Sequence, residues 1–179
     1  MVREGQHEVV VIGRHATHGY LLLLNHGMEG KEYKLPGKKF AQPGKKFVQK
    51  KGEEYYDAAK LAAVRVMLQQ TGLKVAPRRL QRVRFPAQVQ EKLGNKVFFE
   101  VALHDEDSLS VGTTALSGEP EFLLQLDESF GFTFHRDLRH AAAAVSSRTM
   151  AKALLATEAI YSADNCCLLG ILKLFSWWS

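Results

Sequence analysis

The sequence has only two cysteines, Cys166 and Cys167, and no apolar run of the roughly 18 residues that a membrane-spanning helix needs. Adjacent cysteines rarely bridge each other, so we expect no disulfide framework, and a reducing compartment fits the sequence. The chain also lacks a phosphate-loop Gly-Lys-Ser/Thr signature and a Gly-x-Ser-x-Gly nucleophile elbow. These absences argue against a disulfide-stapled domain, a membrane-spanning protein and two common enzyme classes.

Strong metal-binding motifs are missing as well. His15 and His18, or His135 and His140, could form metal pairs, but neither pair has a cysteine or carboxylate at ligand spacing. We therefore predict no metal site and no cofactor. The first residues, MVREGQHEVVVIG, resemble neither a secretory signal nor an arginine- and serine-rich transit peptide.

What the sequence does have is an ordinary globular composition with clustered positive charge. The 179 residues are 46% hydrophobic and 24% charged, which predicts one domain with a core of its own. The net charge of +5 favours polyanionic partners. Between positions 31 and 51 there are eight lysines and one acid, Glu32, and a second cluster has four arginines between positions 78 and 84.

The order of the expected elements is mixed α and β. Alternating and β-branched runs predict strands at 8–14, 19–24, 31–35, 80–86, 96–103, 121–126 and 130–133, the first two joined as a hairpin. Helical spacing predicts helices at 57–70, ending at Gly72, and at 136–159. The tandem repeat PGKKFAQ-PGKKFVQ predicts an exposed, lysine-rich loop insertion at 36–52.

The segment that runs from KLPG through DAAKLAAVRVMLQQTGL resembles the Nudix box, G-x5-E-x7-R-E-U-x-E-E-x-G-U, where U is a bulky aliphatic residue. Val66 stands at the first glutamate of the helix, and Gln69 and Gln70 stand at its acidic pair. The resemblance implies a Nudix-like α/β/α sandwich with a mixed sheet over residues 1–160. The tail at 161–179 ends in the apolar run CCLLGILKLFSWWS, which we expect to dock on protein, with membrane contact or lipidation of the cysteines as the alternative. The degenerate box comprises Asp57, Arg65, Val66, Gln69, Gln70 and Gly72.

The replaced acids bear on catalysis. Nudix enzymes use the acidic pair to hold a divalent metal, and hard cations need several anionic oxygens. A glutamine amide keeps the shape of glutamate but not its charge. We therefore predict that the chain is not an enzyme and has no catalytic residues. The alternative is a nucleoside diphosphate hydrolase with a displaced metal site built from Glu53, Glu54, Asp57 and Glu100.

A second stretch, RFPAQVQEKLGNKVFFEVAL at 84–103, resembles the Nudix-fold proteins of the large subunit of mitochondrial ribosomes. That resemblance implies a structural ribosomal component in the mitochondrial matrix, with rRNA and neighbouring ribosomal proteins as partners. The matching residues are Phe85, Pro86, Leu93, Gly94, Lys96, Val97, Phe98 and Phe99.

The basic clusters fit an RNA partner, because lysine and arginine neutralise backbone phosphates. Two other interpretations stay open: a solvated basic face, and a stand-alone module that binds RNA ends or nucleotides. The residues predicted to contact RNA are Lys38, Lys39, Lys45, Lys46, Lys50, Lys51, Arg78, Arg79, Arg82 and Arg84.

Overall fold

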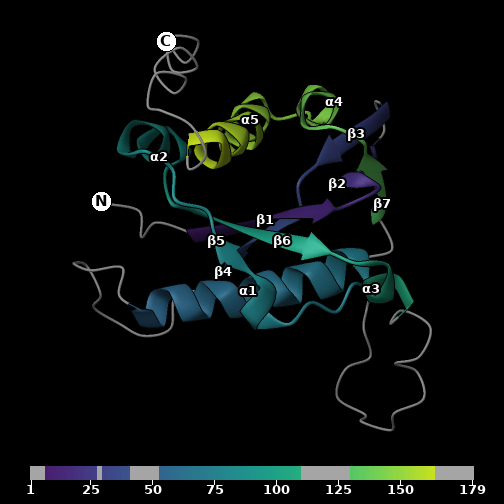
Figure 1. Ribbon diagram of the computed structural model, residues 1–179, viewed down its shortest axis with the longest axis horizontal. Coiled ribbons are helices and arrows are strands. Elements are labelled where there is room, and N and C mark those ends of the chain that lie inside the picture. The colour runs from purple at the N-terminus through teal and green to yellow at the C-terminus, as the bar shows by residue number, and fades with distance from the viewer. Residues whose placement is uncertain (1–6, 28–29, 41–52, 110–129, 164–179) are drawn as a thin grey trace, which may run out of the picture.

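The computed structural model describes residues 7–27, 30–40, 53–109 and 130–163 (Figure 1). Its centre is a mixed sheet with the path β3-β2-β1-β6-β5, to which β4 is added along β1 and β7 along β2. Among the pairings of the described strands, the one between β1 and β6 is parallel and the others are antiparallel. The strands are β1 (His7–His15), β2 (Gly19–Gly27), β3 (Gly30–Lys34), β4 (Gly37–Phe40), β5 (Gln81–Arg82), β6 (Lys96–Leu103) and β7 (Phe130–His135).

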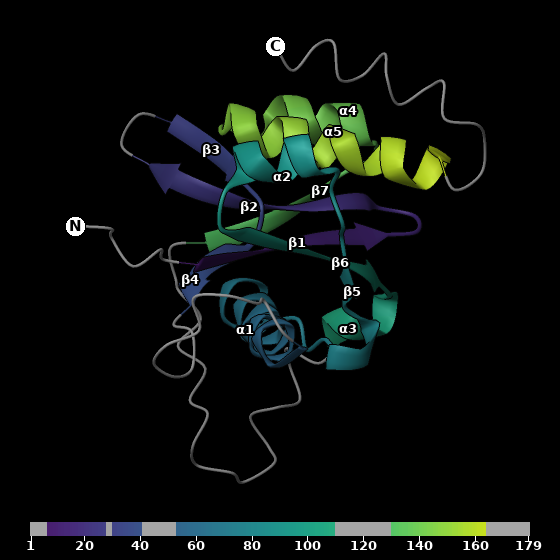
Figure 2. The same ribbon diagram turned by 90° about the vertical axis from the view of Figure 1, so that its left-hand side faces the viewer.

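Helices cover both faces of this sheet, as the two side views show (Figures 1 and 2). One face carries α1 (Glu53–Thr71), and the opposite face carries α2 (Ala87–Leu93), α4 (Leu138–Ala144) and α5 (Arg148–Ala163). A short helix, α3 (Asp105–Leu109), follows β6 directly. No helix in the described ranges is long and apolar enough to cross a membrane.

Two hydrophobic cores explain why β1 reads as a continuous apolar run. Val9 and Val11 pack toward α1, whereas Val10 and Ile12 pack toward α4 and α5, so all four are at most 2% exposed. A strand buried on both faces has no solvent side on which polar residues would alternate. Each such fully buried aliphatic side chain stabilises the fold by about 1.5–3 kcal/mol.

The predicted α/β/α sandwich with a mixed sheet is confirmed, and so are the first hairpin and the strand at 96–103. The hairpin pairs Arg14 with Tyr20 and His15 with Gly19. The stop of the first helix is also where the sequence predicts it. Gly72 has a positive φ of 73°, which glycine adopts without steric cost, and its N–H donates to the Leu68 carbonyl.

The single helix predicted at 136–159 is wrong, because the chain breaks between α4 and α5. Val145 is extended and bridges Tyr33 of β3, and the Ser146 N–H donates to the Tyr33 carbonyl at 2.9 Å. The Ser146 N–H is thus bonded to the edge of β3, whereas in a continuous helix it would donate to a carbonyl of the preceding turn. Ser147 then accepts a hydrogen bond from the N–H of Met150 at the start of α5.

Several other boundaries differ from the sequence pattern. Part of the expected lysine-rich loop is a strand, β4, because its backbone pairs with the free edge of β1. The strand expected at 80–86 is reduced to β5, and a short helix, α3, follows β6. The sequence pattern does not predict α2. The strand predicted at 121–126, the repeat beyond Phe40 and the tail from 164 onward lie outside the described residues.

Candidate phosphate-binding site

The helix that resembles the Nudix box, α1, uses its three altered positions for three different purposes. Val66 is 2% exposed and packs in the core between α1 and the sheet. Gln69 is exposed and lines a cleft beside the helix. Gln70 is half-buried and points to the start of β4. A carboxylate at position 66 would lie in an apolar core, where an unpaired charge is strongly disfavoured.

Gln70 holds β4 to α1 through both atoms of its amide. Its Oε1 accepts a hydrogen bond from the Gly37 N–H at 3.0 Å, and its Nε2 donates to the Gly37 carbonyl at 3.0 Å. A glutamate could make the first contact but could not donate the second when ionised. The amide is therefore matched to a structural role at a position where the Nudix pattern has a metal ligand.

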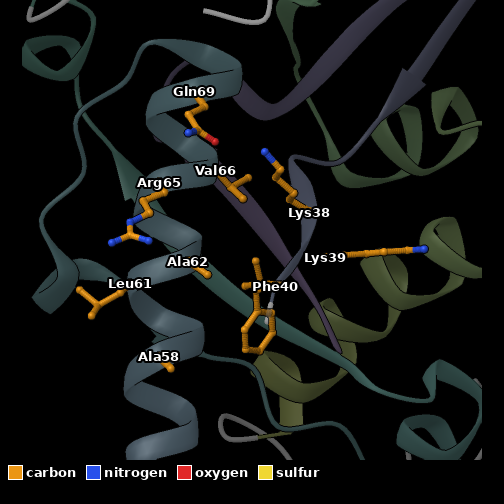
Figure 3. Close-up of a pocket in the computed structure, with 10 residues that line it drawn as sticks. Lys38, Lys39, Phe40, Ala58, Leu61, Ala62, Arg65, Val66 and Gln69 are labelled. Atoms are coloured by element: carbon orange, nitrogen blue, oxygen red, sulfur yellow. The ribbon is translucent and has the colours of Figure 1, made fainter. Parts of the chain in front are cut away.

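A cleft of about 440 Å³ lies between α1 and β4 (Figure 3). Its helix wall presents Ala58, Leu61, Ala62, Arg65, Val66 and Gln69, and its strand wall presents Val9, Lys38, Lys39 and Phe40.

The register of β4 decides which of its lysines faces the cleft. Lys38 lies opposite Val9, which packs toward α1, whereas Lys39 lies opposite Glu8 on the other side of the strand. Figure 3 shows the same arrangement, with Lys38 reaching toward Gln69 and Lys39 extending away from the helix. Lys38 is thus the lysine that lies in the cleft.

The cleft is positively charged without a compensating acid. Its ten lining residues include Lys38, Lys39 and Arg65, and none of the ten is acidic. All three cations are exposed, and the amide of Gln69 adds a further donor and acceptor. Cations gathered in a concave surface concentrate anionic ligands, phosphate groups above all.

Aromatic side chains form the other end of this region. Phe40 contacts the ring of Tyr55 at 5.8 Å between centroids, and the Tyr55 hydroxyl lies 2.8 Å from Nδ1 of His7. Burial raises the pKa of Tyr55 to about 12. Arg82 stacks over Tyr56, with its guanidinium carbon 3.4 Å from the ring centroid. Arg82, which is predicted to contact RNA, therefore lies beside the N-terminal turn of α1, near the end of the cleft formed by Phe40.

The remaining arginines of the second cluster divide by exposure. Arg78 and Arg84 are exposed, but Arg79 is engaged with Asp107 in a bidentate pair, Nη1 to Oδ1 at 2.6 Å and Nη2 to Oδ2 at 2.8 Å. Arg79 also donates to the Ala102 carbonyl. Its contacts are those of a residue that ties the turn after α1 to the end of β6. Lys45, Lys46, Lys50 and Lys51 lie outside the described residues.

Of the four acids of the displaced metal site, the two whose side chains the structure describes, Asp57 and Glu100, are not brought together. Asp57 is exposed on α1 and does not line the cleft. Glu100 lies opposite Ile12, which faces the helices on the other side of the sheet, so the sheet separates Glu100 from α1. Glu53 and Glu54 begin α1, and their side chains lie outside the described set.

One group of polar residues escapes the sequence pattern. His15 and His18 form a visible pair, but their carboxylate neighbour, Asp105, is 90 positions further along the chain. Ligand spacing in the sequence cannot reveal such a partner. The parallel pairing of β1 with β6 brings the ends of these two strands together in the fold, and this pairing explains why Asp105 lies beside the two histidines.

The chain is an α/β sandwich with a basic cleft beside α1. Neither a protein-family model nor a curated protein sequence matches the chain. A solved structure titled "NUDIX hydrolase from Nitrosomonas europaea" matches with a TM-score of 0.44 and 16% identity, over 94% of this chain and 95% of that one. At that level the likeness transfers neither substrate nor mechanism.

The prediction that the chain is not an enzyme is nevertheless corrected by this comparison, since the matching structure is titled a hydrolase. The prediction rested on Val66, Gln69 and Gln70 alone, which are three positions on one helix. Their side chains explain the packing of α1 and β4, and they do not exclude an activity of the chain.

The stretch that resembles the ribosomal Nudix-fold proteins has a structural explanation of its own. Phe85, Leu93, Phe98 and Phe99 are each at most 9% exposed and belong to the two cores. Phe85 and Phe98 pack edge to face, with 5.1 Å between ring centroids. The buried residues of this stretch thus describe how α2 and β6 pack.

Proposed function

We propose that this chain is a Nudix-like domain that binds the phosphate groups of RNA in the cleft between α1 and β4. The observation that carries the proposal is the lining of the cleft, in which Lys38 and Arg65 are cations and none of the ten residues is acidic. Arg65 on the helix wall and Lys38 on the strand wall both line the cleft, so a phosphate backbone that lies along it can reach two cations. Such contacts position RNA without reading its sequence.

The lining of the cleft also favours binding of single-stranded RNA over binding of a rigid duplex. Phe40 and Leu61 give one end of the cleft an apolar surface, and Leu61 is 54% exposed. Unstacked bases bind to apolar and aromatic surfaces, whereas a duplex keeps its bases stacked inside. Alternating phosphate and base contacts along one cleft therefore fit a flexible strand.

Fluorescence anisotropy of a labelled single-stranded RNA tests this proposal on the full chain. Lys38→Glu and Arg65→Glu should each weaken binding at least about 10-fold, since each replaces an attraction with a repulsion. Matched charge reversals on the opposite layer, Lys92→Glu in α2 and Arg139→Glu in α4, should stay within about threefold of the unaltered chain. Equal losses from both pairs of variants would refute the cleft and leave only a general effect of net charge.

The proposed setting of this RNA contact is the large subunit of the mitochondrial ribosome. The support is the resemblance of residues 84–103 together with the basic residues beside α1. Sedimentation of the tagged chain from its own cells tests the setting separately. Co-migration with a large ribosomal particle that survives moderate salt supports it, and migration as a free 20 kDa protein refutes it.

A further inference from the structure

Two histidines and one carboxylate converge where the β1–β2 turn meets the end of β6. His15 ends β1, His18 lies in the turn, and Asp105 begins α3. The Nε2 atoms of His15 and His18 lie 3.2 Å and 3.8 Å from the same carboxylate oxygen, Oδ1 of Asp105. The three ligand atoms all lie within 4.8 Å of one another. The carboxyl ends of parallel strands commonly gather binding residues in this way.

The buried histidine of the group is aimed at this point without a matching hydrogen bond. His15 is 7% exposed, and its Nε2 is buried with no hydrogen-bond partner in the described part of the chain. Asp105 is close enough for an ion pair with it but is not aligned as a hydrogen-bond acceptor. A buried polar atom without a partner is costly, so a ligand at Nε2 would be favoured.

The spacing of the three atoms suits a small transition metal ion. Zinc binds imidazole nitrogen at about 2.0–2.1 Å and carboxylate oxygen at about 2.0–2.2 Å, so neighbouring ligand atoms in a tetrahedral site lie roughly 3.3 Å apart. The two nitrogen–oxygen distances, 3.2 Å and 3.8 Å, bracket that value, and the distance between the two histidine nitrogens is at most 4.8 Å. His18 and Asp105 are 58% and 85% exposed, so their side chains have room to move toward an ion.

We propose that His15, His18 and Asp105 form a binding site for a zinc-class divalent ion. Two imidazoles and one carboxylate select zinc or cobalt over magnesium, which prefers oxygen ligands throughout. Beside the three residues lies a cavity of about 210 Å³, lined in part by Phe132 and Phe134. The fourth position of the ion faces this cavity, where a water molecule or another small ligand completes the tetrahedron.

Thr17 is the positioning residue of this site. Nδ1 of His15 accepts hydrogen bonds from the N–H groups of Thr17 and His18 and lies 3.1 Å from the Thr17 hydroxyl oxygen. An ion at Nε2 requires the ring proton to be on Nδ1, so ion binding would exchange the two backbone hydrogen bonds at Nδ1 for one donated to the Thr17 hydroxyl. Outer contacts of this kind orient metal-binding imidazoles and change affinity by about 10–100-fold.

Calorimetric titration of the tag-free full chain with zinc, together with the absorption spectrum of the cobalt-loaded chain, tests the site. We expect one ion per chain, with affinity reduced at least about 10-fold by His18→Ala and by Asp105→Asn. Thr17→Val should reduce affinity and Thr17→Ser should restore it. The control is His140→Ala, which removes a histidine that pairs with Asp137 at 2.5 Å elsewhere in the fold and should leave binding unchanged.

His18 and Asp105 are exposed, so we expect their variants to fold, and circular dichroism can verify this. A loss of zinc binding in a folded variant then reports on the site itself. Absence of saturable zinc binding by the unaltered chain would overturn the proposal. Binding by folded His18→Ala and Asp105→Asn that equals the unaltered chain would overturn it as well. A thiolate-to-cobalt charge-transfer band that disappears in Cys166→Ser or Cys167→Ser, with affinity lost at the same time, would assign the ion to the cysteines instead.

Discussion

Replacing Gln70 with glutamate changes one amide into a carboxylate of the same shape, between α1 and β4. The variant can still accept from the Gly37 N–H, but at neutral pH it cannot donate to the Gly37 carbonyl. A lost hydrogen bond costs about 0.5–1.5 kcal/mol, and a buried carbonyl left without a donor costs about 1–3 kcal/mol. Because Gly37 is half-buried, we expect Gln70→Glu to lower the free energy of unfolding by about 1–3 kcal/mol at pH 7.

The loss should depend on pH in a defined direction. A protonated carboxyl can donate to the Gly37 carbonyl, so the native state favours the neutral form and raises the pKa of the introduced glutamate above its unfolded value of about 4.3. The stabilising contact is then fully present below about pH 4.3 and is lost as pH rises through the higher folded pKa. The variant should approach the unaltered chain near pH 4 and be weakest above pH 7.

Urea denaturation at pH 4 and pH 7 measures both effects, and thermal unfolding adds a shift of about 2–4 °C per kcal/mol for a chain of this size. Gln69→Glu is the matched control, because Gln69 is the neighbouring, exposed residue in the cleft. It should change stability by no more than about 0.5 kcal/mol. Equal stability of the two variants at pH 7 would refute the structural role of Gln70.

Three further predictions concern pairs that the fold brings together. Asp107→Asn should lower the free energy of unfolding by about 1.5–3 kcal/mol by breaking the pair with Arg79. Burial alone would raise the pKa of Asp107, but hydrogen bonds from Arg79 and from the backbone hold this pKa below its usual value, so the stability is present above about pH 3.9 and is lost as pH falls. The stability of the variant, measured across acid pH, should lack this loss. Tyr55 should ionise near pH 12, with its stabilising effect present below about pH 10 and lost as pH rises through 12; an absorbance titration in which Tyr55→Phe retains the late phase would contradict this. Arg82→Ala should cost about 0.5–1 kcal/mol in urea denaturation by removing the stacking on Tyr56, and no additional loss should follow if Tyr56 is already leucine.

The parts of the fold that follow from local pattern could be predicted from the sequence. The apolar run of β1, the hairpin to β2 and the β-prone run of β6 each reflect burial of neighbouring residues in the chain. Gly72 marks the end of α1 because only glycine adopts its φ without strain.

The parts that depend on distant partners could not be predicted. The strand β4 forms because β1 offers an edge and Gln70, 33 positions from Gly37, holds its backbone. The break at Val145 depends on the edge of β3 in the same way.

For the candidate site, the positive charge of Lys38 could be predicted from the sequence, but the direction of its side chain could not, because the register against Val9 decides it. It also grouped Arg79 with the free cations, although Asp107 occupies its guanidinium.

The salt dependence of RNA binding tests the central claim most directly. Each phosphate contact on single-stranded RNA contributes about 0.7 to the slope of log affinity against log salt concentration. The double variant Lys38→Ala/Arg65→Ala should therefore reduce the slope by about 1.4, while Lys92→Ala/Arg139→Ala should leave it unchanged. A cleft double variant whose slope equals that of the unaltered chain would contradict phosphate binding between α1 and β4.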